Sequence, residues 1–393
     1  MRARLGFIAM FVLTLAACGT DSESRSNQDG GKAAKAGTIK IGAMLPLSGG
    51  NAEAGANMLN AAKLAADDLN AAGGVLGRQI EIVSGDDGCN SEMATTAAEN
   101  ILTTGIVGVA GGYCSGAAIP GSAVLDPKGI PYISMATNPA LTDRGLRTVF
   151  RVTGRDDDQA AFAARFLAGP GGVRKLALLH DNTVYAKGLA ELVRSANNEL
   201  KLGMQIVFFD AITPGETDYR ATLTQVRASG ADTLYFTGYQ GETGVILRQA
   251  KELGLPIRLT GGDATNDPAV IDAAGAAAEG YVATTAPLPA FLPSGEAFAQ
   301  NYRQRFGQAP GPYTMYEYDA VRVLANAIFW AGSTDPKDIV EALRTTRHQG
   351  LTGEIFFDEK GDRQTAVHVT AIVRNGEFRP HKKLDARDNW VDG

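Results

Sequence analysis

Hydroxyl, amide and carboxyl groups follow three predicted strands, where they could bind a small charged ligand. Ser115 begins a predicted helix, so its hydroxyl and the free N–H groups of that helix suit a carboxylate. Thr137 follows the next strand, beside the backbone amide of Ala136, and Asp263 ends a strand further on, where it suits an ammonium group. A capping serine, a turn threonine or a turn aspartate is common by itself. Only their convergence predicts a binding site.

Motifs for catalysis or cofactor binding are missing from the sequence. There is no G-x-x-x-x-G-K-[ST] phosphate loop, no G-x-G-x-x-G after a strand and no G-x-S-x-G nucleophile elbow. The four histidines match no metal-ligand spacing: His180, His348, His368 and His381. Asp86 and Asp87 are adjacent at a strand end and should point to opposite sides, which does not favour acid–base catalysis. We therefore expect a binding protein without a cofactor or metal, and not an enzyme.

The N-terminus predicts export and a lipid anchor. Residues 1–4 are cationic, residues 5–15 are almost entirely apolar, and small residues precede Cys18. This pattern resembles a bacterial lipoprotein signal, in which residues 1–17 are removed and the Cys18 sulfur carries a lipid. The alternative is a transmembrane helix, but a span needs about 20 apolar residues. We therefore expect the mature chain to be anchored on the extracytoplasmic face of a cell membrane.

A flexible linker is expected between the anchor and the folded body. Residues 18–37 are polar and small, without apolar periodicity. Such a segment would hold the body away from the membrane surface.

The three cysteines fit the same interpretation. If Cys18 carries a lipid, Cys89 and Cys114 remain, and an oxidising compartment allows them to pair. Such a disulfide would contribute about 3.5 kcal/mol on the chain-entropy model. Two buried free thiols are the alternative, and the independent indication of export favours the disulfide.

Length and charge limit the organisation of the chain and its partners. A chain of 393 residues exceeds one comfortable hydrophobic core and indicates two domains. The formal net charge of −6, without a Lys/Arg cluster, argues against a nucleic-acid partner.

Apolar runs alternate with helical spacing through most of the chain. Strands are predicted at residues 39–45, 80–84, 106–110, 132–135, 175–180, 205–209, 233–237, 258–260 and 281–284. Helices are predicted at residues 56–72, 91–104, 156–167, 185–200, 219–228, 243–253, 294–306, 316–330 and 336–345. Residues 354–357 and 367–373 are expected to form an antiparallel hairpin, and residues 381–393 a polar tail that adds little.

This alternation predicts an α/β fold with two doubly wound, Rossmann-like lobes of parallel strands covered by helices. The proline-rich residues 286–289 favour a crossing between the lobes. Because ligands of open α/β sheets bind beyond the carboxyl ends of the strands, two facing lobes would form one ligand cleft.

Ordered matches along the chain resemble the leucine/isoleucine/valine-binding proteins of ABC transporters, which have the type I periplasmic-binding-protein fold. They begin with Ile41-Gly42-Ala43-Met44, Leu47-Ser48-Gly49, Asp86-Asp87-Gly88-Cys89 and Tyr113-Cys114-Ser115-Gly116. They continue through Pro139-Ala140-Leu141-Thr142, His180-Asp181, Phe208-Phe209-Asp210, Ile246-Leu247-Arg248-Gln249-Ala250 and Phe357-Asp358-Glu359-Lys360-Gly361. The resemblance covers about residues 38–378, nearly the whole mature chain.

The resemblance implies a domain layout. An N-terminal lobe of residues 38–154 plus 286–353 and a C-terminal lobe of residues 155–285 plus 354–380 would close about a hinge of three crossing strands. It also implies a disulfide between Cys89 and Cys114.

The resemblance further implies roles for individual residues. Ser115 would bind the ligand carboxylate, assisted by Met135 and Thr137. Tyr185 and Tyr239 would close on the ligand, Asp263 would hold its ammonium group and Tyr313 would touch its side chain.

Function follows from the same resemblance. The protein is expected to capture an amino acid of the branched-chain class (Leu, Ile or Val), as a monomer, and to deliver it to the permease of an ABC importer. The alternative is a binding or sensor subunit for an amide, urea or another small metabolite. A lipid-anchored hydrolase is the weakest hypothesis, because no nucleophile–base pair stands out.

Three positions depart from the residues common in the family: Ala54, Tyr113 and Asp263, which is one methylene shorter than glutamate. They leave open which ligand side chain the site prefers.

Overall fold

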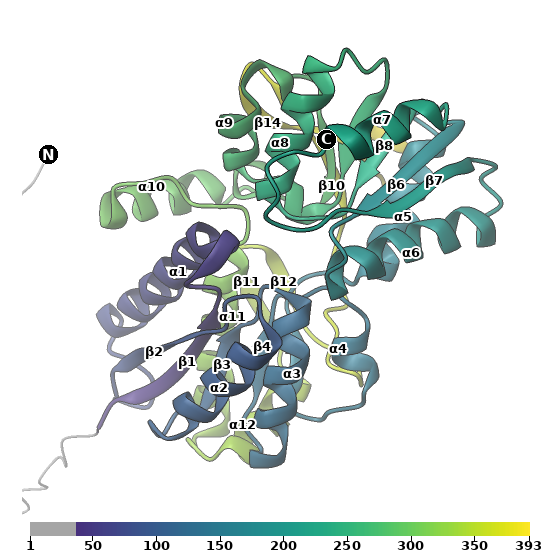
Figure 1. Cartoon of the computed structure of the whole chain (residues 1–393). Coiled ribbons are helices and arrows are strands. Elements are labelled where there is room, and N and C mark those ends of the chain that lie inside the picture. The colour runs from purple at the N-terminus through teal and green to yellow at the C-terminus, as the bar shows by residue number, and fades with distance from the viewer. Residues whose placement is uncertain (1–36) are drawn as a thin grey trace, which may run out of the picture. The chain divides into compact units, whose positions relative to one another are not determined.

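The computed structural model describes residues 37–393. The predicted signal, Cys18 and all but the last residue of the predicted linker lie outside the described residues. Within the described part, no helix combines the length and apolarity needed to cross a membrane. This part contains two large sheets flanked by helices, which we call the first and second lobes (Figure 1). The predicted two-lobed α/β fold is confirmed.

The first lobe is built on a five-stranded parallel sheet with the order β2-β1-β3-β4-β5. Its strands are β1 (Ile39–Leu45), β2 (Ile80–Asp86), β3 (Gly108–Gly111), β4 (Tyr132–Ser134) and β5 (Val149–Arg151). Its early helices are α1 (Ala52–Ala71), α2 (Ser91–Leu102), α3 (Ser115–Leu125) and α4 (Ala140–Asp143). A later segment returns to this lobe with α10 (Gly295–Phe306), α11 (Thr314–Ala331), α12 (Pro336–Thr345) and the ribbon β11 (His348–Gly350) and β12 (Gly353–Ile355).

Both faces of the first sheet are buried. On β1, Ile39, Ile41 and Leu45 pack into a core shared with α1 and α11, whereas Met44 points into a core shared with α2 and α3. Burial on both faces explains why this strand reads as an apolar run, interrupted only by Lys40, rather than as an alternating pattern.

The second lobe is an eight-stranded sheet with the order β15-β14-β13-β10-β9-β8-β6-β7. Its strands are β6 (Lys175–His180), β7 (Gln205–Ala211), β8 (Thr233–Phe236), β9 (Arg258–Gly261), β10 (Val282–Thr285), β13 (Val369–Arg374), β14 (Glu377–Leu384) and β15 (Trp390–Asp392). Its helices are α5 (Asp156–Ala168), α6 (Val184–Glu199), α7 (Arg220–Ala228), α8 (Gln240–Glu252) and α9 (Pro268–Ala274). Strands β6 to β10 are parallel, and β13 to β15 add an antiparallel edge.

The chain passes between the two sheets three times: after β5, after β10 and after β12. A buried ionic cluster ties two of these crossings together. Asp362 accepts hydrogen bonds from Arg151 Nε and Arg155 Nη1, both at 2.7 Å, and from the hydroxyl of Thr142. The Arg151 side chain is fully buried, so the carboxylate supplies a counter-charge that water cannot.

The predicted hairpin near the C-terminus is wrong. Residues 356–368 contain only a single antiparallel bridge, between Phe357 and Arg363. Strand β12 pairs with β11 in the first lobe, whereas β13 pairs with β10 and β14 in the second. The turn-forming residues 358–362 therefore lie in a crossing between lobes, and local turn chemistry could not reveal that the flanking strands belong to different sheets.

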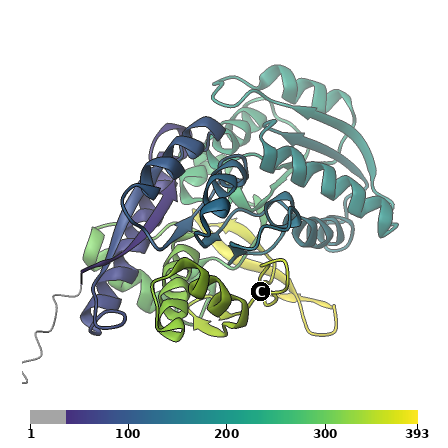
Figure 2. The same ribbon diagram turned by 90° about the horizontal axis from the view of Figure 1, so that it is seen from below.

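The expectation that residues 381–393 add little is also wrong. They complete β14 and form β15, which extend the second sheet (yellow in Figure 2). The Trp390 ring packs against Phe162 and Phe166 of α5, with ring centroids 5.2 and 5.8 Å apart. Trp390, together with His381, which also packs on Phe166, anchors this edge on α5, and the polar composition of the segment concealed the strand.

Candidate ligand-binding site

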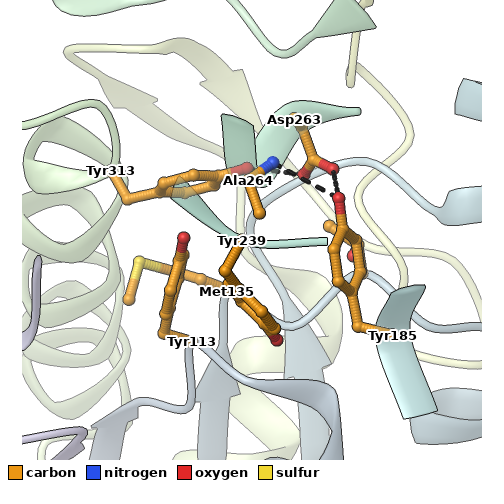
Figure 3. Close-up of a pocket in the computed structure, with 8 residues that line it drawn as sticks. Tyr113, Met135, Tyr185, Tyr239, Asp263, Ala264 and Tyr313 are labelled. Atoms are coloured by element: carbon orange, nitrogen blue, oxygen red, sulfur yellow. Dashed lines mark hydrogen bonds between the residues drawn. The ribbon is translucent and has the colours of Figure 1, made fainter. Parts of the chain in front are cut away.

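A small cavity lies where the carboxyl ends of strands from both sheets meet (Figure 3). Its lining residues are Tyr113, Met135, Thr137, Tyr185, Tyr239, Asp263, Ala264 and Tyr313. About 210 Å³ of space there, part of it open to solvent, is not occupied by protein atoms. The groups that line this space decide what it can bind.

Parallel strands deliver most of these side chains. Tyr113 follows β3 and Thr137 follows β4, whereas Tyr185 begins α6 after β6, Tyr239 is the N-cap of α8 after β8, and Asp263 follows β9. Because the carboxyl ends of parallel strands lie at one edge of a sheet, residues far apart in sequence converge there.

Asp263 forms the acidic end of the cavity. Its Oδ1 accepts a hydrogen bond from the Tyr185 hydroxyl, and its Oδ2 accepts one from the Tyr313 hydroxyl of the first lobe, both at 2.5 Å (Figure 3). Burial and the nearby charge of Asp263 raise the pKa of both tyrosines well above the usual value. Both hydroxyls therefore remain protonated and act as donors.

Asp156 is a second buried acid whose charge interacts with that of Asp263; it does not line the cavity, and sequence reasoning missed it. It is the first residue of α5 and is fully buried, and neither carboxylate oxygen has a hydrogen-bond partner within residues 37–393. Burial, followed by the charge of Asp263, raises its pKa well above the usual value. A cation placed beside Asp263 and Asp156 would relieve both effects. In the sequence, Asp156 is hidden in a run of three aspartates that looks like an ordinary helix start.

Ser115 and Thr137 supply hydrogen-bond donors. Ser115 is the first residue of α3, so its N–H has no partner in the helix, and its Oγ accepts a bond from Asn138 N (3.3 Å). The Ser115 hydroxyl proton therefore remains available. In the described part of the chain, the backbone N–H of Thr137 donates to no other group, whereas its hydroxyl lies near the Asp156 carboxylate, whose charged form it favours. Such donors suit an anionic group.

Two of the residues predicted for the site do not line the cavity. Ser115 is buried next to Cys114, and Ala136 is fully buried. The N–H of Ala136 donates to Ser134 Oγ (3.1 Å), and its carbonyl accepts a bond from Arg151. The Ala136 amide is therefore already occupied.

Aromatic rings form the walls. The Tyr113 ring lies edge-on to those of Tyr239 and Tyr313, with centroids 5.9 and 5.2 Å apart, and Tyr185 contacts Tyr239 at 5.3 Å. These rings and Met135 give an apolar surface suited to aliphatic groups. Tyr113 and Ala264 were not among the predicted site residues. Only the position of Tyr113, two residues before Ser115, could have indicated its role.

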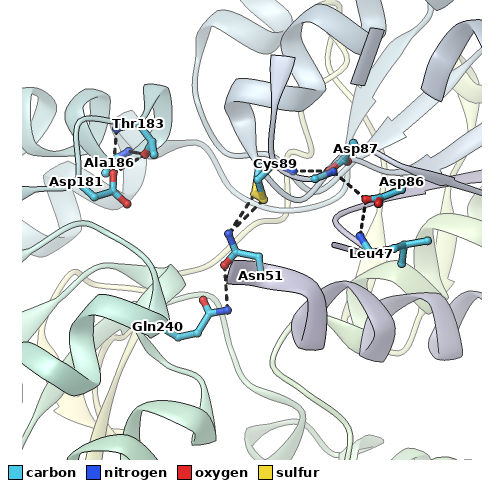
Figure 4. The surroundings of a disulfide bond; sticks show 12 residues. Leu47, Asn51, Asp86, Asp87, Cys89, Asp181, Thr183, Ala186 and Gln240 are labelled. Carbon is cyan, nitrogen blue, oxygen red and sulfur yellow. Dashed lines mark hydrogen bonds between the residues drawn. A yellow bond between two sulfur atoms is a disulfide. The ribbon is translucent and has the colours of Figure 1, made fainter. Parts of the chain in front are cut away.

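A disulfide lies beside the site (Figure 4). Cys89 and Cys114 are joined, with Cα atoms 5.2 Å apart, and Cys114 directly precedes Ser115. Asn51 Nδ2 donates to Cys89 Sγ (3.3 Å), and Asn51 Oδ1 accepts a bond from Gln240 Nε2 of the second lobe (3.0 Å). The disulfide therefore supports both the segment that carries Ser115 and a contact between the lobes.

Together these groups can bind a small zwitterion. One end offers buried carboxylates, another offers hydroxyl and amide donors, and the walls are aromatic. Within residues 37–393, no cluster of three or more His, Cys, Asp or Glu side chains could hold a metal ion.

Comparisons with known proteins agree with this geometry. Residues 38–377 match the family described as periplasmic binding protein. An amino acid binding protein from Pseudomonas aeruginosa is 36% identical over 335 residues, covering 84% of this chain and 89% of that protein. A leucine-, isoleucine-, valine-, threonine- and alanine-binding protein from the same organism is 33% identical over 83% of this chain and 87% of its own length.

Solved structures share the fold. The leucine-binding protein LivK from Thermotoga maritima has a TM-score of 0.83 and 29% identity, covering 90% of this chain and 100% of that one. The branched-chain amino acid transporter substrate-binding protein LivJ from Streptococcus pneumoniae, in complex with isoleucine, has a TM-score of 0.80 and 27% identity. The match covers 91% of this chain and 100% of that one. With the family match over residues 38–377, these similarities show that the chain belongs to the periplasmic binding proteins of the type I fold.

Proposed function

We propose that this protein captures a free α-amino acid of the branched-chain class between its lobes and delivers it, as a monomer, to the permease of an ABC importer. The observation that carries the proposal is that the buried Asp263 and Thr137, with its free backbone N–H, line one small cavity between aromatic walls. The names of the relatives, which include leucine-, isoleucine- and valine-binding proteins, support the same ligand class.

In the proposed complex, the ligand ammonium group lies against Asp263 and Asp156. The ligand carboxylate accepts hydrogen bonds from the hydroxyls of Ser115 and Thr137 and from the N-terminus of α3. Each end loses its hydration on enclosure, so each needs such partners. The tyrosine walls and Met135 take the aliphatic side chain.

We further propose that the mature protein is an exported lipoprotein, anchored through Cys18, with a disulfide between Cys89 and Cys114. The lipobox-like sequence before Cys18 supports the anchor. An anchor would keep the body close to the membrane that holds the permease. Mass spectrometry of the membrane fraction should find a lipid-modified N-terminal peptide beginning at Cys18, and Cys18→Ser should release the protein. An unmodified N-terminus would contradict the anchor.

Isothermal titration against the twenty amino acids tests the ligand class. We expect leucine, isoleucine or valine to bind at micromolar concentration or tighter. Failure of every aliphatic amino acid to bind would refute the proposal. Mass spectrometry of the ligand that co-purifies with the protein gives an independent identification.

Uptake of radiolabelled leucine into cells separates transport from sensing. Deletion of the gene should abolish high-affinity uptake, and expression of the wild-type protein should restore it. Normal uptake after deletion, with leucine binding intact in vitro, would instead support a sensor.

A further inference from the structure

A second cavity lies directly beyond the first. About 260 Å³ of space there, part of it open to solvent, is not occupied by protein atoms, and its lining residues are Ala54, Asn57, Met58, Tyr113, Asn266, Asp267, Gly311, Pro312, Tyr313 and Thr314. Tyr113 and Tyr313 line both cavities. These two rings, 5.2 Å apart and edge-on, therefore form the boundary between the amino-acid site and this second chamber.

The second chamber exists because the residues at its edge are small. Ala54, in the first turn of α1, contributes only a methyl group, and Gly311 contributes no side chain. The buried Met58 and Pro312 give the chamber an apolar floor.

One polar group of the chamber is a hydrogen-bond donor. Asn57 Oδ1 accepts bonds from the Tyr302 hydroxyl (3.0 Å) and from Gln308 Nε2 (2.7 Å), which fixes the orientation of this amide. Within residues 37–393, the Asn57 Nδ2 group donates to no acceptor. It is therefore available to a ligand that accepts a hydrogen bond.

Two other polar groups are acceptors. The Asn266 amide nitrogen donates to Thr285 Oγ1, which leaves Asn266 Oδ1 as an acceptor. Asp267 is the N-cap of α9, where its Oδ1 accepts a bond from Ala269 N (2.9 Å). In the described part of the chain, neither Asn266 Oδ1 nor Asp267 Oδ2 receives a hydrogen bond.

A donor on the first lobe therefore faces the same chamber as two acceptors on the second. We propose that this chamber holds a carboxamide at the end of a ligand side chain, so that the site also takes α-amino acids of the glutamine and asparagine type. The carboxamide oxygen accepts from Asn57, and its NH₂ group donates to Asn266 and Asp267. This inference rests on the proposed amino-acid function and adds a side-chain class to it.

Charge distinguishes the carboxamide from related groups. No lysine, arginine or histidine lines the chamber, whereas Asp267 does. A side-chain carboxylate would therefore meet another carboxylate, and an ammonium group would leave the Asn57 donor opposite a cation. A thioether or alkyl end would leave all three polar groups without partners.

Calorimetry with size-matched ligands tests the inference on the full-length wild-type protein. Glutamine should bind at least tenfold more tightly than glutamate, which has the same shape, and than methionine, which has the same length without donors. Lysine is a control for simple attraction to the negative charge of Asp267, and it should bind more weakly than glutamine if the chamber recognises a carboxamide. Equal or tighter binding of methionine or lysine would overturn the inference.

Two variants locate the effect. Ala54→Phe should fill the chamber and weaken glutamine binding about tenfold while changing alanine affinity less than twofold. Asp267→Asn preserves the helix cap and should narrow the gap between glutamine and glutamate to less than threefold. If Ala54→Phe weakens alanine and glutamine equally, the chamber does not hold the side chain. If the wild-type protein binds no α-amino acid, the proposed function itself fails, which is a different result from binding without a glutamine preference.

Discussion

Asn51 of the first lobe accepts a hydrogen bond from Gln240 of the second lobe, 3.0 Å away, while its amide nitrogen donates to the sulfur of Cys89 (Figure 4). Asn51 is the N-cap of α1, and Gln240 is the first residue of α8. Two helix starts and the disulfide therefore meet at one contact between the lobes.

This contact should contribute to the closed, ligand-bound form. Asn51→Ala or Gln240→Ala should weaken amino-acid binding about 3- to 10-fold, because one hydrogen bond contributes about 0.5 to 1.5 kcal/mol. The double variant should cost little more than the larger single effect, as expected for two residues that share one interaction. Calorimetry with the best ligand measures this, and Asn198→Ala, on the exposed end of α6, is the control. Additive losses would argue against a shared contact.

Removing the negative charge of Asp263 or Asp156 should weaken amino-acid binding, which isothermal titration calorimetry measures. Asp263→Asn should weaken binding by about 1 to 3 kcal/mol, because the ammonium group loses a charged partner and only one of the two tyrosine hydroxyls keeps an acceptor. Asp156→Asn should also weaken amino-acid binding, but by less than Asp263→Asn does. The exposed Asp272→Asn serves as the control. If both Asp263→Asn and Asp156→Asn leave the affinity unchanged, the ligand binds elsewhere.

The buried cluster at the crossings should be important for stability. Asp362→Asn leaves the fully buried Arg151 without its counter-charge, and we expect a loss of about 3 to 5 kcal/mol in the free energy of unfolding. Urea denaturation followed by circular dichroism measures this loss. Asp388→Asn, on an exposed turn, should change stability by less than about 0.5 kcal/mol. A loss near that of the control would show that the cluster is not required.

The disulfide should stabilise the native state. Its cysteines are 25 residues apart, and a double Cys89→Ser, Cys114→Ser variant should lose about 2 to 4 kcal/mol. Thermal unfolding with and without dithiothreitol measures the effect. Reductant should destabilise the wild-type protein but leave the double variant unchanged. A wild-type protein insensitive to reductant would show that the bridge is absent or contributes nothing.

Glu317 should make stability depend on pH. It is fully buried in α11, neither carboxylate oxygen has a hydrogen-bond partner within residues 37–393, and burial raises its pKa to about 8. In the unfolded chain Glu317 ionises near its ordinary pKa of 4.5, whereas in the folded chain it still keeps its proton at that pH. The contribution of Glu317 to the free energy of unfolding is therefore most favourable below about pH 4.5, where the carboxyl is protonated in both states. It becomes less favourable as the pH rises towards 8, because the unfolded chain then gains stability by ionising.

The variant Glu317→Gln tests this directly. At pH 8 it should be more stable than the wild-type protein by about 1 to 3 kcal/mol, and the difference should shrink towards pH 5. Denaturation curves across this pH range measure the trend, with the exposed Glu199→Gln as the control. A difference that does not vary with pH would contradict the assignment.

The sequence by itself determined the repeating architecture and many of the site residues. The run at Ile39–Leu45 forms the predicted strand, because burial on both faces leaves an apolar signal that only Lys40 interrupts. Ser115 begins a helix as expected, and Thr137 and Asp263 follow strands whose carboxyl ends meet. Local patterns carry this information, since strand, turn and helix start are each encoded within a few residues.

Only the tertiary structure decided which groups share the cavity and which remain free. Asp156 looks like part of a helix start, and its burial beside Asp263 depends on packing between elements far apart in the chain. The pairing of β13 with β10, and the anchoring of the C-terminal edge by Trp390, likewise depend on contacts between distant segments. Periodicity records which face of an element is buried, but it does not record what that face is buried against.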